Sequence, residues 1–277
     1  MRTRLTILCE NTVNKPVQAI GEHGFACLIE TPSGRFLFDT GQGLGILHNA
    51  ELLQARLEEI DGIILSHGHF DHAGGLLPVL TRCGPKNVYA HPALFTPRYW
   101  VGRYERRANG LPFNRSEAEA AGACFLFEPS FHQLAPGIWL SGEVPRLDLT
   151  HIGDSALQAE GADGDLHPDP LSDDLSLVLE SPRGLVVLTG CAHAGLPNIL
   201  NHVCTQTGQK RIYAVIGGLH LAPAADDHFM AAVSALQKYR VQRIGVAHCT
   251  GSRRAAELLH QFPDAVFFAS VGSTFDL

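Results

Sequence analysis

Five short apolar segments, each ending in polar residues followed by small ones, constrain the fold of this chain more than any other feature. The segments and the polar residues at their ends are FLFDTG with Asp39, IILSHGH with His67, VVLTGCAH with Cys191 and His193, VIGGLH with His220, and GVAHCTG with His248. Apolar runs of this length are typical of buried strands. In an open sheet with outer helices, the loops beyond the carboxyl ends of the strands build the functional site. The sequence therefore predicts that these strand ends meet at one place.

Strands and helices are expected to alternate in two similar runs. Each run begins with a hairpin, one turning at PSG (residues 32–34) and one at SPRG (residues 181–184), and continues with strand–helix units. Helical spacing of apolar residues predicts helices at 44–60, 196–208, 226–240 and 252–262. This order favours an α/β fold of mixed sheets with outer helices, in a single domain that spans residues 1–277.

The segment at about 94–150 interrupts this order. It mixes aromatic residues with arginines and has no clean periodicity, so we expect a lid-like insertion. The following residues, 151–172, are rich in Asp, Gly and Pro and are expected to form a long loop. Arginines can hold phosphate by bidentate hydrogen bonds, although a solvated lid explains them equally well. The candidate substrate-binding residues are Arg98, Arg103, Arg106, Arg107, Glu143 and Arg146.

Composition excludes several classes of protein. A formal charge of -7 argues against general nucleic-acid binding, which needs an excess of Lys and Arg. No apolar run approaches the roughly 20 residues of a membrane span, and the N-terminus lacks a signal-peptide pattern. The seven cysteines have no paired spacing, which favours reduced thiols. We therefore expect a cytoplasmic protein with a small-molecule substrate and no membrane partner; its oligomeric state is left open.

The segment ILSHGHFDH concentrates four metal-binding side chains within six positions. His67 and His69 point the same way in an extended or turning backbone, so both can reach one metal ion, while Asp71 and His72 can reach a second. Catalytic zinc typically keeps three protein ligands, and the natural candidates to complete the two sets are His193 and His248. Two such ions about 3.5–4 Å apart can activate one water for hydrolysis. The alternative is a polar turn with hydrogen-bonded histidines.

A resemblance supports the metal interpretation. SHGHFDHAGGL resembles the HxHxDH signature of the metallo-β-lactamase superfamily, and FDTG is similar to its first motif. The resemblance implies a four-layer αβ/βα sandwich and a role for Asp39 in supporting the metal-binding loop. TGCAHAGLPNIL, VIGGLHL, AHCTG and SGEVPR resemble the branch whose members are named 7,8-dihydropterin-6-yl-methyl-4-(β-D-ribofuranosyl)aminobenzene 5'-phosphate synthase.

The chain also departs from many members of that superfamily. It lacks a GHTxG loop before the second hairpin and a bridging Asp after it. Cys191 stands at the tip of the second hairpin instead, with His193 two residues later. We therefore assign His193 to the first metal ion and leave open whether Cys191 is a thiolate ligand or a buried thiol.

The functional hypothesis is a metal-dependent hydrolase with two divalent transition-metal ions, zinc or else manganese or iron. Its substrate would be small and phosphorylated, or pterin- or nucleotide-like. Asp71 would also orient the attacking water. His220 is expected to act as a ligand, as a proton donor to the leaving group or as an anchor for an anion, unless it is a core histidine bonded to a carbonyl. The alternatives are a dihydropterin-type synthase that uses the metals to assist a diphosphate leaving group, and a ligand-sensing protein with little turnover.

Overall fold

The strands of this computed structural model, which describes residues 3–14, 17–148 and 154–277, form two large sheets and one small sheet. The first large sheet contains β1 (Arg4–Cys9), β2 (Ala26–Thr31), β3 (Gly34–Phe38), β4 (Gly62–Ile64), β5 (Lys86–Ala90), β8 (Ala123–Phe127) and β18 (Thr274–Asp276). The second contains β9 (His132–Ala135), β10 (Ile138–Leu140), β13 (Ser176–Leu179), β14 (Leu185–Thr189), β15 (Ile212–Gly218), β16 (Arg243–Ala247) and β17 (Val266–Phe268).

The two large sheets are built by the same scheme. The first has the strand order β18-β1-β2-β3-β4-β5-β8 and the second β17-β16-β15-β14-β13-β10-β9. In each, an antiparallel hairpin, β2–β3 or β13–β14, is followed by strands that run parallel to its second strand. The carboxyl ends of these parallel strands lie at one edge of each sheet. The two hairpin-led runs predicted from the sequence are therefore confirmed.

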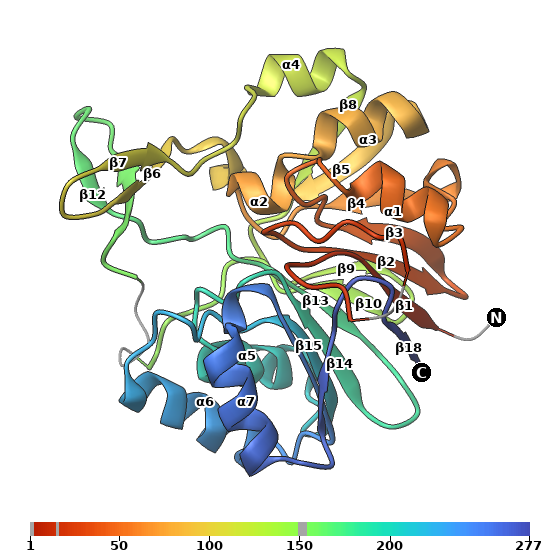
Figure 1. Cartoon of the computed structure of the whole chain (residues 1–277), viewed down its shortest axis with the longest axis vertical. Helices are drawn as coiled ribbons and strands as arrows, with labels where there is room; N and C mark the ends of the chain where they lie inside the picture. Colours follow the sequence, from red (N-terminus) through yellow and green to blue (C-terminus); the bar gives the residue numbers. More distant parts are fainter. Residues whose placement is uncertain (1–2, 15–16, 149–153) are drawn as a thin grey trace.

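Helices cover the outer face of each sheet, so the molecule has four layers (Figure 1). Over the first sheet lie α1 (Ile46–Leu52), α3 (Leu76–Cys83) and α4 (Arg115–Ala120), with the short α2 (Phe70–Ala73) at its edge; over the second lie α5 (Leu196–Thr207), α6 (Asp226–Lys238) and α7 (Ser252–Gln261). Single 3₁₀ turns are formed by Leu57–Glu59, Pro92–Phe95 and His248–Thr250. The helices expected at 196–208, 226–240 and 252–262 are α5, α6 and α7, whereas the one expected at 44–60 is α1 followed by a 3₁₀ turn. No helix in the described part of the chain is both long and apolar enough to cross a membrane.

The hydrophobic core lies in three layers that follow from this order. One apolar cluster packs α1 and α3 on the first sheet, and another packs α5, α6 and α7 on the second. The third cluster lies between the sheets and combines Ile29 and Phe38 from the first with Leu188 and Ile216 from the second. Since side chains of both sheets share this inner layer, the edges that carry the strand ends are held against each other.

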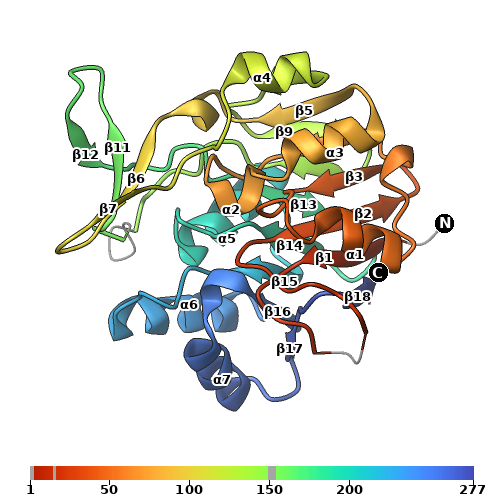
Figure 2. The same cartoon turned by 45° about the horizontal axis from the view of Figure 1, so that its top comes forward.

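The small sheet stands apart from the sandwich (Figure 2). It has the order β12-β11-β6-β7, and we call it the arm; its strands are β6 (Arg98–Val101), β7 (Arg106–Ala108), β11 (Leu157–Glu160) and β12 (Leu166–Pro168). The expected insertion at 94–150 therefore needs correction, because 115–140 contribute α4, β8, β9 and β10 to the main layers; its last two residues lie outside the described ranges. The loop expected at 151–172 is wrong in its described part, since it supplies half of the arm.

The inner core layer gives a first prediction. Ile29 is fully buried between the sheets, so Ile29→Ala should lower the free energy of unfolding by about 2–5 kcal/mol. Urea unfolding followed by circular dichroism measures this change. The matched control is Met230→Ala on the exposed face of α6, which should alter stability by no more than about 0.5 kcal/mol. Equal effects of the two substitutions would contradict the assignment of the core.

Candidate metal centre

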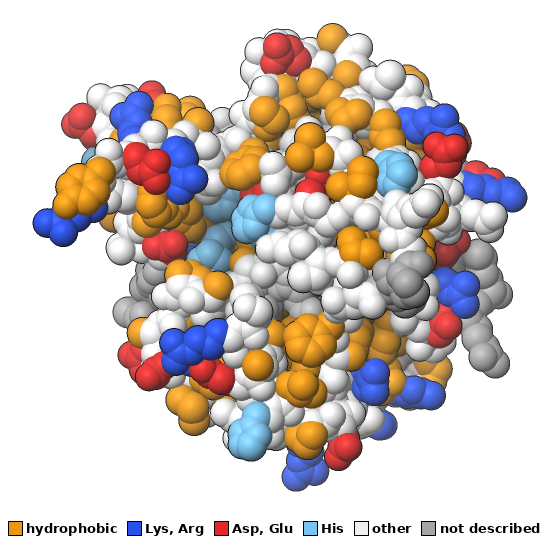
Figure 3. Space-filling view, viewed as in Figure 1, with side chains coloured by type: hydrophobic (Ala, Val, Ile, Leu, Met, Phe, Trp, Pro, Cys, Tyr) orange, Lys and Arg blue, Asp and Glu red, His pale blue; other side chains and the backbone are white. Residues whose placement is uncertain are grey.

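The ends of the parallel strands bring the predicted residues together. Asp39 directly follows β3, His67 follows β4, Cys191 follows β14, and His248 follows β16. Histidine side chains line a hollow between the arm and the rest of the molecule (Figure 3). The prediction that these strand ends meet is therefore confirmed.

The first cluster consists of His67, His69 and His193. One ring nitrogen from each of these residues lies within 4.8 Å of the other two, and all three side chains are buried. His67 Nε2 is 3.0 Å from His69 Nδ1. Among the described residues, His69 Nε2 and both ring nitrogens of His193 have no hydrogen-bond partner. A buried polar atom without a partner is costly, and three imidazoles in this arrangement are a common zinc-binding set. The residues present therefore fit a metal ion.

The second cluster consists of Asp71, His72 and His248. His248 Nε2 lies 3.2 Å from His72 Nε2 and 3.3 Å from Asp71 Oδ2, and His72 Nε2 is 4.0 Å from the same carboxylate oxygen. His23 reaches Asp71 Oδ2 at 3.1 Å from the exposed side of the cluster. A carboxylate and two imidazoles converge here from opposite halves of the chain, and this set also suits a divalent transition metal.

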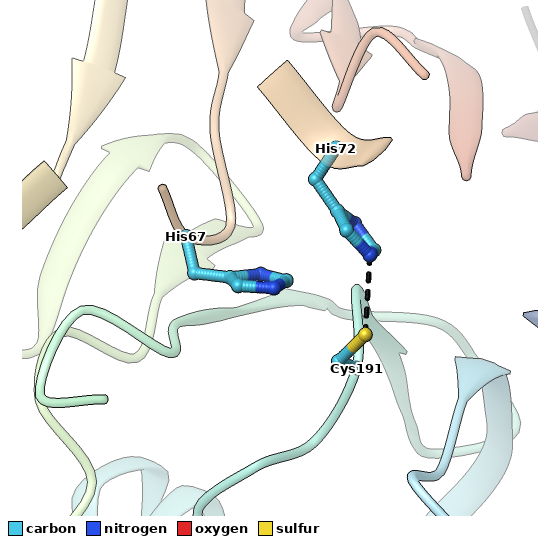
Figure 4. A group of neighbouring side chains, drawn as sticks. All are labelled: His67, His72 and Cys191. Atoms are coloured by element: carbon cyan, nitrogen blue, oxygen red, sulfur yellow. Dashed lines mark hydrogen bonds between the residues drawn. The ribbon is translucent and has the colours of Figure 1, made fainter. Parts of the chain in front are cut away.

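Cys191 lies between the two clusters. Its sulfur is 3.1 Å from His72 Nε2, and the two side chains point toward each other beside His67 (Figure 4). The sulfur also groups with ring nitrogens of His193 and His220 within 4.8 Å. Both ring nitrogens of His220 are buried and have no hydrogen-bond partner among the described residues. Cys191 and His220 therefore remain alternative additional ligands, as the sequence left them.

Hydrogen bonds to the outer ring nitrogens orient the imidazoles. His72 Nδ1 lies 2.7 Å from Asp39 Oδ2, and His248 Nδ1 lies 2.9 Å from Asn11 Oδ1. A carboxylate or amide oxygen can only accept, so Nδ1 donates in both contacts and Nε2 is the nitrogen turned toward the cluster. Asp39 also accepts from the backbone N–H and the hydroxyl of Ser66, at 2.7 Å each. Its expected supporting role beneath the metal-binding loop agrees with these contacts.

Burial and neighbouring charges set the protonation of the site. Burial, together with neighbouring histidines, holds the pKa values of His67, His69 and His193 well below the usual range of histidine. Burial also acts to lower the pKa of His72, but the carboxylates of Asp39 and Asp71 raise it to about 9. The first cluster thus presents neutral imidazoles, which is the form that binds metals.

Strained backbone accumulates at the strand ends. Asp39, Ala192, His220 and His248 adopt left-handed conformations, with φ between 48° and 59°. This region is uncommon for residues other than glycine and costs of the order of 1–3 kcal/mol each. Because the surrounding hydrogen bonds and packing must compensate for that cost, the strain marks residues whose direction matters.

The arginines expected to bind substrate contact other protein groups, either buried carboxylates and backbone carbonyls or aromatic rings of the arm. Arg98 is 3% exposed and pairs with Asp169 and Asp173, so it is a buried structural residue. Arg146 donates to the backbone carbonyls of Pro170 and Leu171. Glu143 is exposed. Three arginines are exposed on the arm and stack on its aromatic rings; the stacked pairs are Arg103–Tyr104, Arg106–Tyr99 and Arg107–Trp100.

Several residues of the site were not identified from the sequence. Glu10 and Asn11 follow β1 and hold His248, the former by accepting its backbone N–H at 2.7 Å. The same rule of polar residues after an apolar strand could have found them in the segment RLTILCEN. Asp173 and Asp174 accept the backbone N–H groups of Gly68 and Ala194, which lie in the loops of the first cluster, and no sequence pattern indicates such contacts.

The chain is similar to known proteins over most of its length. Residues 20–248 match the family described as the metallo-beta-lactamase superfamily. The chain is 30% identical over 256 residues to a protein of Methanocaldococcus jannaschii named "7,8-dihydropterin-6-methyl-4-(beta-D-ribofuranosyl)-aminobenzene-5'-phosphate synthase", with 88% of this chain and 86% of that protein covered.

Solved structures agree with the fold. The crystal structure of Tm1679, described as a metal-dependent hydrolase of the beta-lactamase superfamily, has 27% sequence identity and a TM-score of 0.86, with 99% of both chains covered. YhfI of Bacillus subtilis, described as a metallo-beta-lactamase fold protein, has 12% identity and a TM-score of 0.61, with 100% of both chains covered. The four-layer sandwich predicted from the sequence is thus confirmed.

The contacts of Asp39 give a second prediction. Asp39→Asn should weaken metal binding by about 10–100-fold, because the amide replaces an acceptor that orients His72 with a group that also donates. Competition with a chromophoric chelator measures the affinity. The control is Asp276→Asn, a half-exposed surface aspartate that pairs with Arg4, and it should leave the affinity unchanged. Wild-type affinity in the Asp39 variant would refute the orienting role.

Proposed function

Because the chain belongs to the metallo-β-lactamase superfamily, we propose that it is a metal-dependent enzyme that activates water against a small, phosphorylated or pterin- or nucleotide-like substrate. The observation that carries this proposal is the pair of adjacent buried clusters, of which the first holds ring nitrogens that lack protein partners among the described residues. These nitrogens make no hydrogen bond to the described residues, and a bound metal ion would give each of them a partner.

The proposed ligand sets are His67, His69 and His193 for the first ion and Asp71, His72 and His248 for the second. Zinc is the proposed metal, with manganese or iron as alternatives, since imidazole and carboxylate ligands accept all three. When bound, two such ions supply Lewis-acid activation of water and of substrate oxygen atoms. Cys191 lies within reach of both sets and is a candidate additional ligand.

The side chains around the clusters have distinct proposed roles. Asp39 holds His72 in one tautomer through the 2.7 Å contact to Nδ1. Asp71 Oδ2 lies 3.1 Å from His23 Nε2 and 3.3 Å from His248 Nε2, and this carboxylate would orient a water in the hollow. His220 would transfer a proton to a leaving group; its ring lies 4.2 Å from that of His193, and both its nitrogens lack hydrogen-bond partners among the described residues.

A second candidate function rests on the relative from Methanocaldococcus jannaschii, which is named as a synthase. In a reaction of that class an aromatic amine would displace diphosphate from a pterin, and the metals would assist the departing diphosphate. The identity of 30% across most of both chains favours this candidate over a sensor without turnover.

Metal analysis tests the common premise. Protein purified without chelator should carry at least about one equivalent of transition metal per chain. His67→Ala/His69→Ala should lose at least half of that content, while His167→Ala/His260→Ala, which removes two exposed histidines, should retain it. Mass spectrometry of the metals measures all three proteins. Metal content below one equivalent that does not change in the His67/His69 variant would refute the proposal.

The two activities are separated by the dependence on an amine. With a pterin methyl diphosphate ester, a hydrolase should release product without any other substrate, at a rate that follows metal loading. A synthase should release diphosphate only when an aminobenzene compound is present. Chromatography of the products distinguishes the two outcomes, and lack of turnover with these compounds and with generic phosphodiesters would contradict both.

A further inference from the structure

We propose that Asp173 and Asp174 position the ligands of the first metal ion, by tying the loop of His67 and His69 to the loop of His193. We call this pair the acidic brace. The inference rests on the proposed function in one respect, since it takes those three histidines as metal ligands. The brace lies in the connection between β12 and β13, which neither the sequence pattern nor the ligand clusters assign to the site.

Asp173 fixes the loop from the first half of the chain. Its Oδ2 accepts the backbone N–H of Gly68 at 2.7 Å, and Gly68 stands between His67 and His69. Two residues after Asp173, Leu175 donates its N–H to the carbonyl of Ser66 at 3.0 Å. The backbone is thus held on both sides of His67 by one short segment.

Asp174 fixes the loop from the second half. Its Oδ2 accepts the backbone N–H of Ala194 at 2.8 Å, directly after His193. Both aspartates of the brace are buried, at no more than 2% exposure. Consecutive residues therefore hold two loops that are more than 120 positions apart in the sequence, and the separation of His193 from the other two histidines depends on them.

Arg98 of the arm compensates the charge of the brace. Its Nη2 lies 2.6 Å from Asp173 Oδ1, and its Nε lies 2.7 Å from Asp169 Oδ2. Both oxygens of Asp173 are therefore engaged, one by the guanidinium and one by Gly68. Removing one partner of a buried ion pair leaves an uncompensated charge, which is strongly destabilising. Arg98 thereby connects the arm to the metal-binding loop.

Leu94 and Arg98 approach the backbone at position 68 so closely that only glycine fits there. A Cβ atom there would lie 2.0 Å from the carbonyl oxygen of Leu94 and 2.4 Å from Nη1 of Arg98. Any larger residue would push the loop away from the brace. The residue between the two histidines of the motif is thus limited to glycine by Leu94 and by Arg98, the arginine that pairs with Asp173.

A positioning role differs from a general stabilising role in what it does to metal binding. Asp174→Ala should weaken binding at the first site by about 10–100-fold, a loss typical of residues that orient metal ligands. Asp174→Asn retains an oxygen that accepts from Ala194 and should restore most of the affinity. Ile29→Ala is the matched control, because it destabilises the core without touching a ligand loop. Cobalt titration followed by visible absorption gives the affinity, and urea unfolding gives the stability of each variant.

The outcomes separate the brace from the proposed function. Wild-type cobalt affinity in Asp174→Ala, or a loss no larger than in Ile29→Ala, would overturn the brace and leave the metal enzyme standing. A wild-type protein that binds no cobalt would overturn both. If Asp174→Ala does not fold, Asp173→Asn replaces it, because its amide faces Arg98 and should weaken binding at least tenfold more than Asp174→Asn does. Equal affinities in those two variants would count against the brace.

Discussion

Buried imidazoles in mutual contact are the constraint on which the rest of the structure depends. The rings of His67, His69, His72, His193 and His248 form a continuous series, with neighbouring centroids 4.3 to 5.2 Å apart. Protonating all of them would concentrate positive charge away from water, which is very costly. Leaving all of them neutral turns lone pairs toward one another. A divalent cation avoids both unfavourable arrangements, because several neutral rings can donate their lone pairs to one ion.

The fold brings residues to this histidine cluster from both sheets. Parallel strands of both sheets end at facing edges, so neither half of the chain contains all the residues of either cluster. Residues outside the clusters then fix the direction of each ring, as Asp39 does for His72 and Asn11 does for His248. Left-handed backbone at four of the strand ends is tolerated because the shared core between the sheets holds these edges together.

The sequence predicts those parts of the structure that depend on local residue patterns. Apolar runs followed by polar residues identify the strands and most cluster residues, and helical spacing identifies α5, α6 and α7. The arm is not predicted by such patterns, because Arg98 pairs in register with Ala159 across sixty-one positions and short exposed strands carry little periodicity. The helix α3 is not among the helices expected from the sequence; Pro78 stands in its first turn, where proline is tolerated.

Contacts made by side chains to distant backbone leave no trace in the sequence at all. Asp173 and Asp174 look like ordinary acidic residues before a strand, and only the folded chain reveals the N–H groups that they accept. The same holds for the burial of Arg98, since an arginine beside aromatic residues is more typical of a surface. Residues of this kind have to be found in three dimensions.

The pairing of β18 with β1 has a consequence for how the protein reaches this state. Arg4 lies opposite Asp276, so the first sheet gains its edge strand only when residues 272 positions apart have met. The histidine cluster likewise draws on positions from 67 to 248. Folding dominated by such distant contacts is slow, because the entropy of closing long loops is lost before the contacts form. The imidazoles should therefore come together late, and an ion that binds the finished cluster stabilises the last step of folding rather than guiding the first.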